Sequence, residues 1–398
     1  MKRIAIFCDG TWNRHDAVNP TNVVRLAQAV KHTADDARKQ QVFYVLGVGA
    51  GRGSNAVART LDRFAGGAMG WGLIENIEDA YRALVFCYEP GDEIFIFGFS
   101  RGAYTARSLA GLLRSCGIPP RENVGRIGEA IKRYRSRSRD TKPDDPKSFE
   151  WRRDFAPFTA TSEAEWNWRQ KTRPGLCVNL TIKYLGVWDT VGALGVPGYW
   201  AAAPLFNKRH QFHDADLSRT VLSARHAVAI DERRKTFPAA LWSDKLDDMN
   251  RRAMGLDEDT TLHPDTRKDW AYRQEWFPGD HGSVGGGGDR QGLSSFSFDW
   301  VAEGARRADL SMDAAALEQV QKGRNIREAL TNKSSVGFMT KLMRWIAKDR
   351  KGPTRVVDVS QTTRDRVACD PTYLPKTLEN VLPKLQETIT KDDLLPPV

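Results

Sequence analysis

The chain has 398 residues, of which 40% are hydrophobic and 28% charged, so it can bury a large core and has the composition of an ordinary globular protein. Its formal net charge of +10 permits nucleic acid or an anionic membrane surface as a partner, but no RRM, KH or zinc-finger signature is present. Five scattered cysteines without a CxxC pair argue against zinc and fit free thiols in a reducing compartment. We therefore expect no nucleic-acid partner, no metal and no cofactor.

The amino-terminal region predicts a parallel α/β sheet. Residues 3–8, 42–48 and 93–97 have the apolar runs of strands, and helical spacing follows at about 21–30 and over 73–88. Strands that alternate with helices are typical of a doubly wound sheet with helices on both faces. The first residues, too short for a signal-peptide core, predict a strand rather than a leader. No apolar run approaches the roughly 20 residues of a membrane span. We expect synthesis in the cytoplasm and, if the protein is exported, a route that needs no leader.

The most informative motif follows the third predicted strand. Gly98-Phe99-Ser100-Arg101-Gly102 lies between that strand and a run of apolar residues at helical spacing. A Gly-x-Ser-x-Gly in this context is the nucleophile elbow, in which a tight turn presents the serine hydroxyl at the carboxyl end of the sheet. Gly98 and Gly102 leave room for the turn. Ser100 is therefore the candidate nucleophile.

The remaining chain contains one interruption and one extension of the α/β pattern. Residues 118–176 carry basic and polar clusters with turn signals and predict an insertion, either a lid over the active-site face or a solvated helical excursion. The later elements are expected as a strand at 178–187, a helix at 216–228, short strands at 237–242 and 272–277, and a helix at 293–307. These patterns predict a catalytic domain over 1–310 and a C-terminal appendage of helix and loop over 311–398.

Two residues fit the partners that a serine nucleophile needs. A serine hydroxyl requires a base, normally a histidine that is oriented by a carboxylate. In the elbow fold the acid and then the histidine follow the serine, each just beyond the carboxyl end of a strand. Asp189 follows the strand at 178–187, and His281 follows the strand at 272–277. Asp280 is a rival acid, but the immediate neighbour of a base usually points away from it.

The other histidines fit the role of base less well. His226 falls within the predicted helix at 216–228 and is interpreted as a structural residue. The others lie in loops or precede the serine in the chain: His15, His32, His210, His213 and His263.

An oxyanion hole needs two backbone N–H donors. The N–H of Arg101, directly after the nucleophile, is one candidate, and Gly10 or Thr11 in the loop after the first strand supplies the second. Asp9 is expected to brace that loop, although the loop also reads as a plain tight turn. The glycine-rich stretch 47–53 lacks the residues of a P-loop and is interpreted as a flexible connector.

Five segments together resemble the α/β-hydrolase family that includes the catalytic domains of type VI secretion phospholipase effectors. The segments, in family order, are Phe7-Cys8-Asp9-Gly10-Thr11-Trp12-Asn13, Gly98-Phe99-Ser100-Arg101-Gly102-Ala103, Val187-Trp188-Asp189-Thr190-Val191-Gly192, Ala229-Ile230-Asp231-Glu232-Arg233 and Trp276-Phe277-Pro278-Gly279-Asp280-His281. The resemblance covers about residues 1–310 and implies Ser100, Asp189 and His281 as the triad. The family tends to have an aliphatic residue before the histidine and an aspartate two after it, whereas this chain has Asp280 and Ser283. Beside the best-known effectors, we expect no counterpart of their large membrane-associating C-terminal half in this sequence.

The leading hypothesis is a serine ester hydrolase, with lipid or phospholipid esters as the substrate class that the resemblance implies. The alternatives are a hydrolase of small soluble esters or peptides and a non-enzymatic binding module on a hydrolase fold. Residues 338–351 place four large apolar side chains on one helical face with basic residues around them, including Arg350. This pattern favours a core-packed helix with a solvated basic rim, and it also fits peripheral contact with an anionic membrane.

Overall fold

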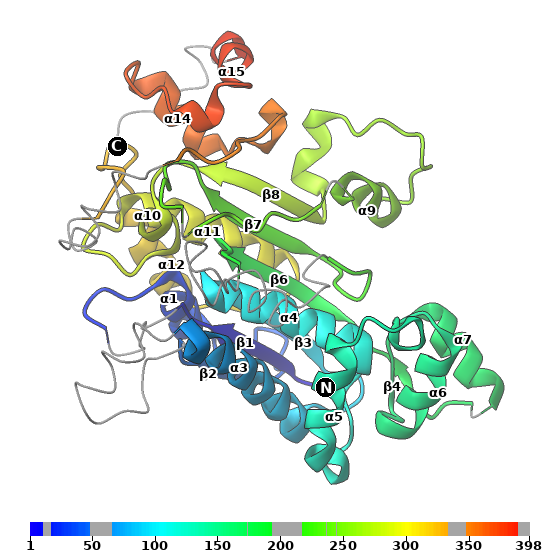
Figure 1. Cartoon of the computed structure of the whole chain (residues 1–398). Coiled ribbons are helices and arrows are strands. Elements are labelled where there is room, and N and C mark those ends of the chain that lie inside the picture. The colour runs from blue at the N-terminus through cyan, green and yellow to red at the C-terminus, as the bar shows by residue number, and fades with distance from the viewer. Residues whose placement is uncertain are drawn as a thin grey trace.

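A six-stranded sheet lies at the centre of the described part of the molecule, and every strand runs parallel to its neighbours (Figure 1). The computed structural model describes residues 1–10, 17–47, 66–172, 174–192, 217–235, 237–243, 245–332 and 348–388. The strands, in spatial order, are β2 (Gln40–Val45), β1 (Arg3–Cys8), β3 (Glu93–Phe99), β6 (Ile182–Trp188), β7 (Ala224–Ala229) and β8 (Tyr272–Phe277). The predicted parallel α/β architecture is confirmed.

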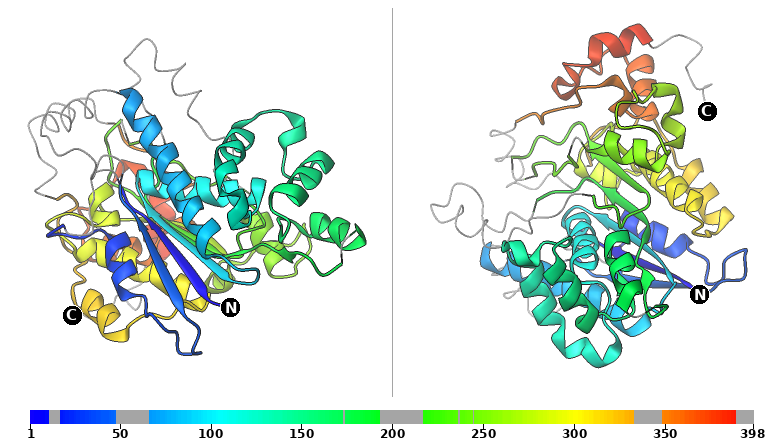
Figure 2. Two further views of the ribbon diagram at one scale, coloured as in Figure 1. Left: turned by 90° about the horizontal axis from the view of Figure 1, so that it is seen from below. Right: turned by 90° about the vertical axis from the view of Figure 1, so that its right-hand side faces the viewer.

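The sheet is covered by helices on both faces, as Figure 2 shows. Alternate side chains of a strand point to opposite faces, so Ile4 and Ile6 pack under α3 (Gly66–Cys87) and α4 (Arg101–Cys116), while Ala5 and Phe7 pack under α1 (Asn22–Ala29), α11 (Gly292–Arg307) and α12 (Ala314–Lys322). The central strands are buried on both faces, so most of their residues are apolar.

The insertion forms a separate helical layer at the amino-terminal edge of the sheet. Its elements are η1 (Arg121–Arg126), α5 (Ile127–Arg135), η2 (Arg139–Thr141), α6 (Pro146–Phe155) and α7 (Glu163–Thr172), with a two-stranded sheet of β4 (Thr159–Ala160) and β5 (Val178–Asn179). It is anchored to the last turn of α4, where Arg114 Nη1 donates to Thr161 Oγ1 (3.0 Å) and Arg152 Nη1 donates to Ser115 O (2.9 Å). Ser100 precedes the opposite end of α4. The lid-like position expected for 118–176 is therefore wrong for the described residues, which form the alternative, a helical excursion (Figure 1).

Two predictions in the second half of the sheet are corrected. The stretch predicted as a helix at 216–228 contains strand β7 from Ala224 onward, and the strand predicted at 237–242 is irregular chain with a single bridge between Val191 and Ala239. The strand β7 lies between β6 and β8 and is completely buried, so it has no alternation of polar and apolar residues. Its alanines favour a helix locally, and the tertiary pairing overrides that preference.

The described C-terminal segment, residues 348–388, packs against the second half of the sheet. It contains η5 (Val356–Asp358), α14 (Gln361–Cys369), η6 (Lys376–Leu378) and α15 (Leu382–Thr388), next to β8 in Figure 1. Val359 forms a parallel bridge with Trp276 of β8, and Val367, Leu378 and Leu385 share one buried cluster with Trp276. Short helices α9 (Leu246–Ala253), η3 (Pro264–Asp269) and α10 (His281–Gly285) complete the described elements. None of the described helices is both long and apolar enough to cross a bilayer.

Candidate active site

Ser100 lies in a strained turn between β3 and α4. Its backbone has φ 60° and ψ −125°, a left-handed φ that non-glycine residues rarely adopt and that is tolerated at functional turns. A Cβ on Gly98 would lie 2.4 Å from the Gly102 carbonyl oxygen, and one on Gly102 would lie 2.1 Å from the Cys8 carbonyl oxygen. Only glycine fits these close approaches, so the elbow predicted from the sequence is present, with Ser100 at the carboxyl edge of the sheet.

His281 is brought to Ser100 by the turn after β8. The Ser100 hydroxyl lies 2.8 Å from His281 Nε2. The imidazole ring packs against Phe99 (centroids 4.6 Å apart) and against the edge of Phe237 (4.9 Å). These aromatic contacts restrict the ring, and Glu232 Oε2 accepts the backbone N–H of His281 at 3.3 Å.

Asp189 completes the chain of hydrogen bonds from the end of β6. Its Oδ2 lies 2.6 Å from His281 Nδ1, and its Oδ1 accepts the N–H of Ala229 at 2.9 Å. A carboxylate only accepts hydrogen bonds, so the proton on the ring lies on Nδ1, and Nε2 is the atom that accepts from Ser100. The three predicted side chains thus meet, although β6 and β8 lie far apart in sequence.

A fourth side chain, Arg350, binds the same carboxylate. Its Nη1 lies 2.6 Å from Asp189 Oδ1 and its Nη2 lies 3.0 Å from Oδ2. Burial would raise the pKa of the Asp189 carboxyl, but the charge of Arg350 and the hydrogen bond with His281 outweigh burial and hold that pKa far below its ordinary value. Asp189 is therefore ionised although it is completely buried.

Arg350 was missed as a site residue because the sequence gives no local signal for it. It belonged to the basic rim of the predicted helix at 338–351, where a solvated or membrane-facing position was expected. That assignment is corrected, because its side chain is only 6% exposed. The rest of that predicted helix, up to residue 347, lies outside the described residues.

Asp280 does not compete with Asp189 for the imidazole. Its side chain accepts the N–H of Ser283 at 2.9 Å and caps α10. Burial raises the pKa of the Asp280 carboxyl. Ser283, the other position where this chain departs from the family pattern, donates its hydroxyl to Leu330 O at 3.0 Å. Asp280 and Ser283, the two residues that depart from the family pattern, thus both form hydrogen bonds that stabilise the turn containing His281.

His226 is a buried structural residue, as interpreted, but on strand β7. Its Nδ1 pairs with Gln274 Oε1 at 3.0 Å and its Nε2 accepts the N–H of Thr190 at 3.2 Å. Burial lowers the pKa of His226 to about 3, which keeps the ring neutral. His263 is an exposed cap of η3, His32 lies ahead of β2, and His15, His210 and His213 fall outside the described residues.

The loop after β1 is braced by Asp9. The Asp9 carboxylate accepts from the Gly10 N–H (2.6 Å), the Thr21 hydroxyl (2.8 Å) and the Tyr44 hydroxyl (2.5 Å). The Gly10 N–H is therefore directed to Asp9 in this arrangement, and Thr11, the other candidate donor, lies outside the described residues. Arg101 is the first residue of α4, directly after Ser100, and burial lowers the pKa of its guanidinium to about 10.

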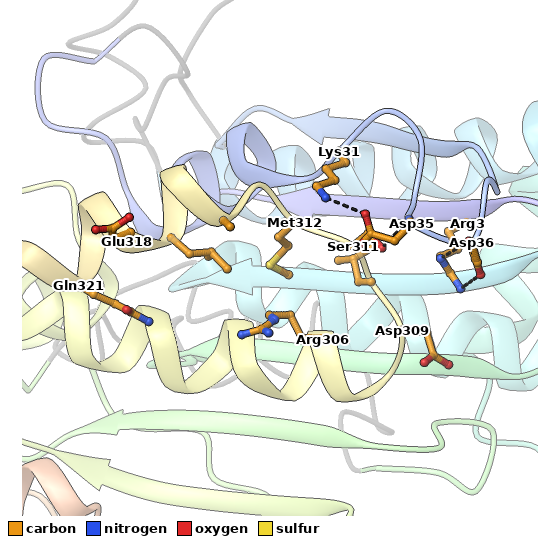
Figure 3. A pocket seen from close by; sticks show the side chains of 13 residues that line it. Arg3, Lys31, Asp35, Asp36, Arg306, Asp309, Ser311, Met312, Glu318 and Gln321 are labelled. Carbon is orange, nitrogen blue, oxygen red and sulfur yellow. Dashed lines mark hydrogen bonds and ion pairs between the residues drawn. The ribbon is translucent and has the colours of Figure 1, made fainter.

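A cavity of about 570 Å³ lies elsewhere, between α12 and the start of β1 (Figure 3). Four of its charged side chains form ion pairs, with Arg3 bound to Asp36 at 2.6 Å and Lys31 bound to Asp35 at 2.7 Å. Arg3 begins β1 at the amino-terminal edge of the sheet, and Ser100 is not among the residues that line this cavity. Within the described residues no three His, Cys, Asp or Glu side chains gather as a metal site would require. The glycine-rich stretch 47–53 lies mostly outside them.

A doubly wound parallel sheet with a serine at a strand–helix elbow defines the class of α/β-hydrolase-like proteins. Residues 2–304 match the model of the family described as "T6SS, Phospholipase effector Tle1-like, catalytic domain". The match spans most of the chain, and the protein belongs to this family. The family is one of phospholipase effector domains, so lipid ester hydrolysis is the activity class that membership supports.

Individual relatives are distant. An uncharacterized protein of Saccharomyces cerevisiae, YEL023C, is 26% identical over 244 residues, which cover 59% of this chain and 32% of that protein, so the match spans about a third of the relative. An uncharacterized protein from Pseudomonas aeruginosa is 16% identical with a TM-score of 0.40, covering all of this chain and 60% of that one. The Tle1 effector bound to the VgrG spike of the type 6 secretion system is 16% identical with a TM-score of 0.33, covering 72% and 52%. Likenesses at this level carry no argument about mechanism.

Proposed function

We propose that the protein is a serine ester hydrolase in which Ser100 is the nucleophile, His281 the general base and acid, and Asp189 the residue that orients His281. The observation that carries the proposal is the continuous hydrogen-bonded path from the Ser100 hydroxyl through both ring nitrogens of His281 to Asp189. This constellation activates an alcohol that is otherwise a poor nucleophile.

The reaction follows from the positions of these atoms. Ser100 Oγ attacks the acyl carbonyl carbon while His281 Nε2 takes the hydroxyl proton, and Asp189 stabilises the imidazolium that forms. The tetrahedral intermediate collapses, the C–O bond of the ester breaks, and His281 returns the proton to the departing alcohol. Water then attacks the acyl-enzyme, its proton passes through His281 to Ser100 Oγ, and the carboxylic acid leaves.

The oxyanion of the intermediate needs donors on the other side of the carbonyl carbon. The backbone N–H of Arg101 is proposed as one donor, because its residue follows the nucleophile at the N-terminus of α4. Thr11 is proposed as the second. The Gly10 N–H would have to leave Asp9 to serve, whereas Asp9 in its present position holds the loop close to the elbow.

Lipid esters are proposed as the substrate class on the strength of family membership. The enzyme can be tested first without knowledge of its substrate, with a fluorophosphonate probe at neutral pH. Wild type should become labelled and Ser100→Ala should not. Failure of folded wild type to react would rule out the catalytic proposal and favour a binding module.

The substrate class is tested separately with anionic phospholipid vesicles and short p-nitrophenyl esters. Release of fatty acid from the vesicles by wild type, and not by Ser100→Ala, supports a lipid substrate. Release from short esters alone would refute the lipid assignment and leave a small-ester hydrolase.

A further inference from the structure

Arg350 is held in one place by four acceptors. Besides the two oxygens of Asp189, its guanidinium donates to the carbonyl oxygens of Ala229 (3.0 Å) and Phe237 (2.8 Å). A planar guanidinium that binds both oxygens of a carboxylate fixes the plane of that carboxylate, which an ammonium group cannot do. Because Asp189 Oδ2 is also the partner of His281 Nδ1, the orientation of the imidazole depends on this contact.

Arg350 comes from outside the part of the chain that matches the family model, which ends at residue 304. The segment 348–388 is tied to the sheet beside the site. Thr377 Oγ1 donates to Ile230 O (2.9 Å), and Tyr373 OH donates to Asp231 Oδ2 (2.8 Å). The position of the guanidinium is therefore fixed by the docking of the C-terminal segment onto β7 and β8.

We propose that Arg350 is a positioning residue that fixes the Asp189 carboxylate against His281, and that the C-terminal segment is thereby part of the catalytic unit rather than an appendage. This inference rests on the proposed hydrolase function. Arg350 touches neither Ser100 nor the ring of His281 in the described contacts, so it acts through Asp189 alone.

Because Arg350 is charged, the proposal also predicts how the labelling rate depends on pH. Arg350 shares the negative charge of Asp189, so the carboxylate stabilises the imidazolium less than it would alone. Within the described residues, the charged groups near the histidine also include Glu232 with its partner Arg234, and Asp280. None of these is altered in the variants below. Loss of the Arg350 charge should therefore move the acidic limb of the rate profile to higher pH.

The test measures the rate of fluorophosphonate labelling across pH for full-length wild type, Arg350→Met and Arg350→Lys. In labelling, Ser100 Oγ attacks phosphorus, the P–F bond breaks, and His281 takes the hydroxyl proton, so the rate reports the activated nucleophile without a chosen substrate. We expect Arg350→Met to label about 100-fold more slowly, the size of effect that a misplaced catalytic group causes. Its acidic limb should move to higher pH.

Arg350→Lys keeps the charge but not the two-point contact, so it should label about 10-fold more slowly with the acidic limb of wild type. Arg355→Met is the matched control, because Arg355 lies in the same segment but pairs at the surface with Asp247 and Asp358. It should label within about 2-fold of wild type.

The outcomes separate the two proposals. If wild type does not label, or Ser100→Ala labels equally, the hydrolase function fails. If wild type labels and Ser100→Ala does not, but both Arg350 variants keep the wild-type rate and profile, the positioning role alone is overturned. If Arg350→Met does not fold, a folded Arg350→Lys decides: a reduced rate supports the proposal and an unchanged rate overturns it. A rate that falls equally at every pH in Arg350→Met, in proportion to the unfolded fraction, would also overturn it.

Discussion

The insertion and the C-terminal segment are both outside the repeating α/β pattern, and a buried arginine joins the first to helix α4 and the second to strand β7. Arg152 of α6 binds Glu165 Oε2 (2.9 Å) and the carbonyl oxygens of Ser115 and Pro143. Arg350 likewise binds a buried carboxylate and two backbone carbonyl oxygens. Each buried guanidinium thus donates to a carboxylate and to two backbone carbonyl oxygens, which offsets the cost of burying its charge.

The two buried carboxylates, Glu165 and Asp189, differ in their second partner. Glu165 is bound on its other side by a second arginine, Arg169 Nη2, at 2.5 Å. Its negative charge is therefore balanced by two arginines of the insertion itself. Asp189 is bound on its other side by His281, which leads to Ser100. A buried arginine–carboxylate pair is therefore structural at the amino-terminal edge of the sheet, where Arg152 binds Glu165. At the carboxyl edge, the pair of Arg350 and Asp189 is connected to the candidate site.

Ser100→Ala sets the baseline for this comparison and has the largest expected effect. Turnover or labelling should fall by roughly 10⁴- to 10⁶-fold, because nothing else in the path can form the covalent bond. The melting temperature should change little, since the hydroxyl contributes one hydrogen bond, to His281. The check is a labelling assay paired with thermal unfolding; a drop of many degrees would mean that the residue is mainly structural.

Arg152→Met should break the structural pair without touching the site. Removal of one partner leaves Glu165 incompletely compensated, at a cost of about 3–5 kcal/mol in the free energy of unfolding. The labelling rate per folded molecule should stay at the wild-type value, in contrast to Arg350→Met. Urea unfolding and labelling measure the two effects. The matched control is Arg153→Met, a half-exposed neighbour that pairs with Asp154 and lies over the Trp168 ring, and comparable losses in both variants would contradict the structural role of the buried pair.

The two buried carboxylates should also make stability fall in acid. Burial raises the pKa of Glu165, but Arg152 and Arg169 outweigh burial and hold it below its ordinary value of 4.5. The unfolded chain then takes up the proton first, so stability is complete above about pH 4.5 and declines as pH falls below it. Glu165→Gln should flatten this decline in urea unfolding between neutral and acidic pH. Glu150→Gln, on the exposed side of α6, is the control, and an unchanged slope in Glu165→Gln would contradict the assignment.

The elbow could be predicted from the sequence because local geometry determines it. The close approaches at Gly98 and Gly102 demand glycine whatever the rest of the chain does, and the order of strands then placed Asp189 and His281 at the same edge. Asp280, which caps α10, was distinguished from Asp189, which reaches the ring, because the immediate neighbour of a base usually points away from it.

The features that were not predicted depend on contacts between distant segments. The strand β7 has an alanine-rich sequence and is a strand only because β6 and β8 flank it. The sequence of the insertion does not indicate at which edge of the sheet the insertion packs. Arg350 is one of many basic residues in the sequence, and the carboxylate that it binds in its buried position, Asp189, lies 161 residues earlier in the chain. Patterns of charge and hydropathy cannot identify such a partner.

The smallest effect tests whether the C-terminal segment docks as one unit with Arg350. Thr377→Val removes the hydroxyl that donates to Ile230 O and leaves that buried carbonyl without it, at a cost of about 1 kcal/mol. If docking positions Arg350, the labelling rate should fall at the same urea concentration at which the C-terminal segment is released from the sheet. In Thr377→Val, the loss of labelling and the release of the segment should both occur at a slightly lower urea concentration. Limited proteolysis of residues 348–388 and labelling, followed in the same urea series, measure this. Labelling that persists after the segment has become cleavable would show that the catalytic unit ends at the sheet and would make the C-terminal segment equivalent to the insertion.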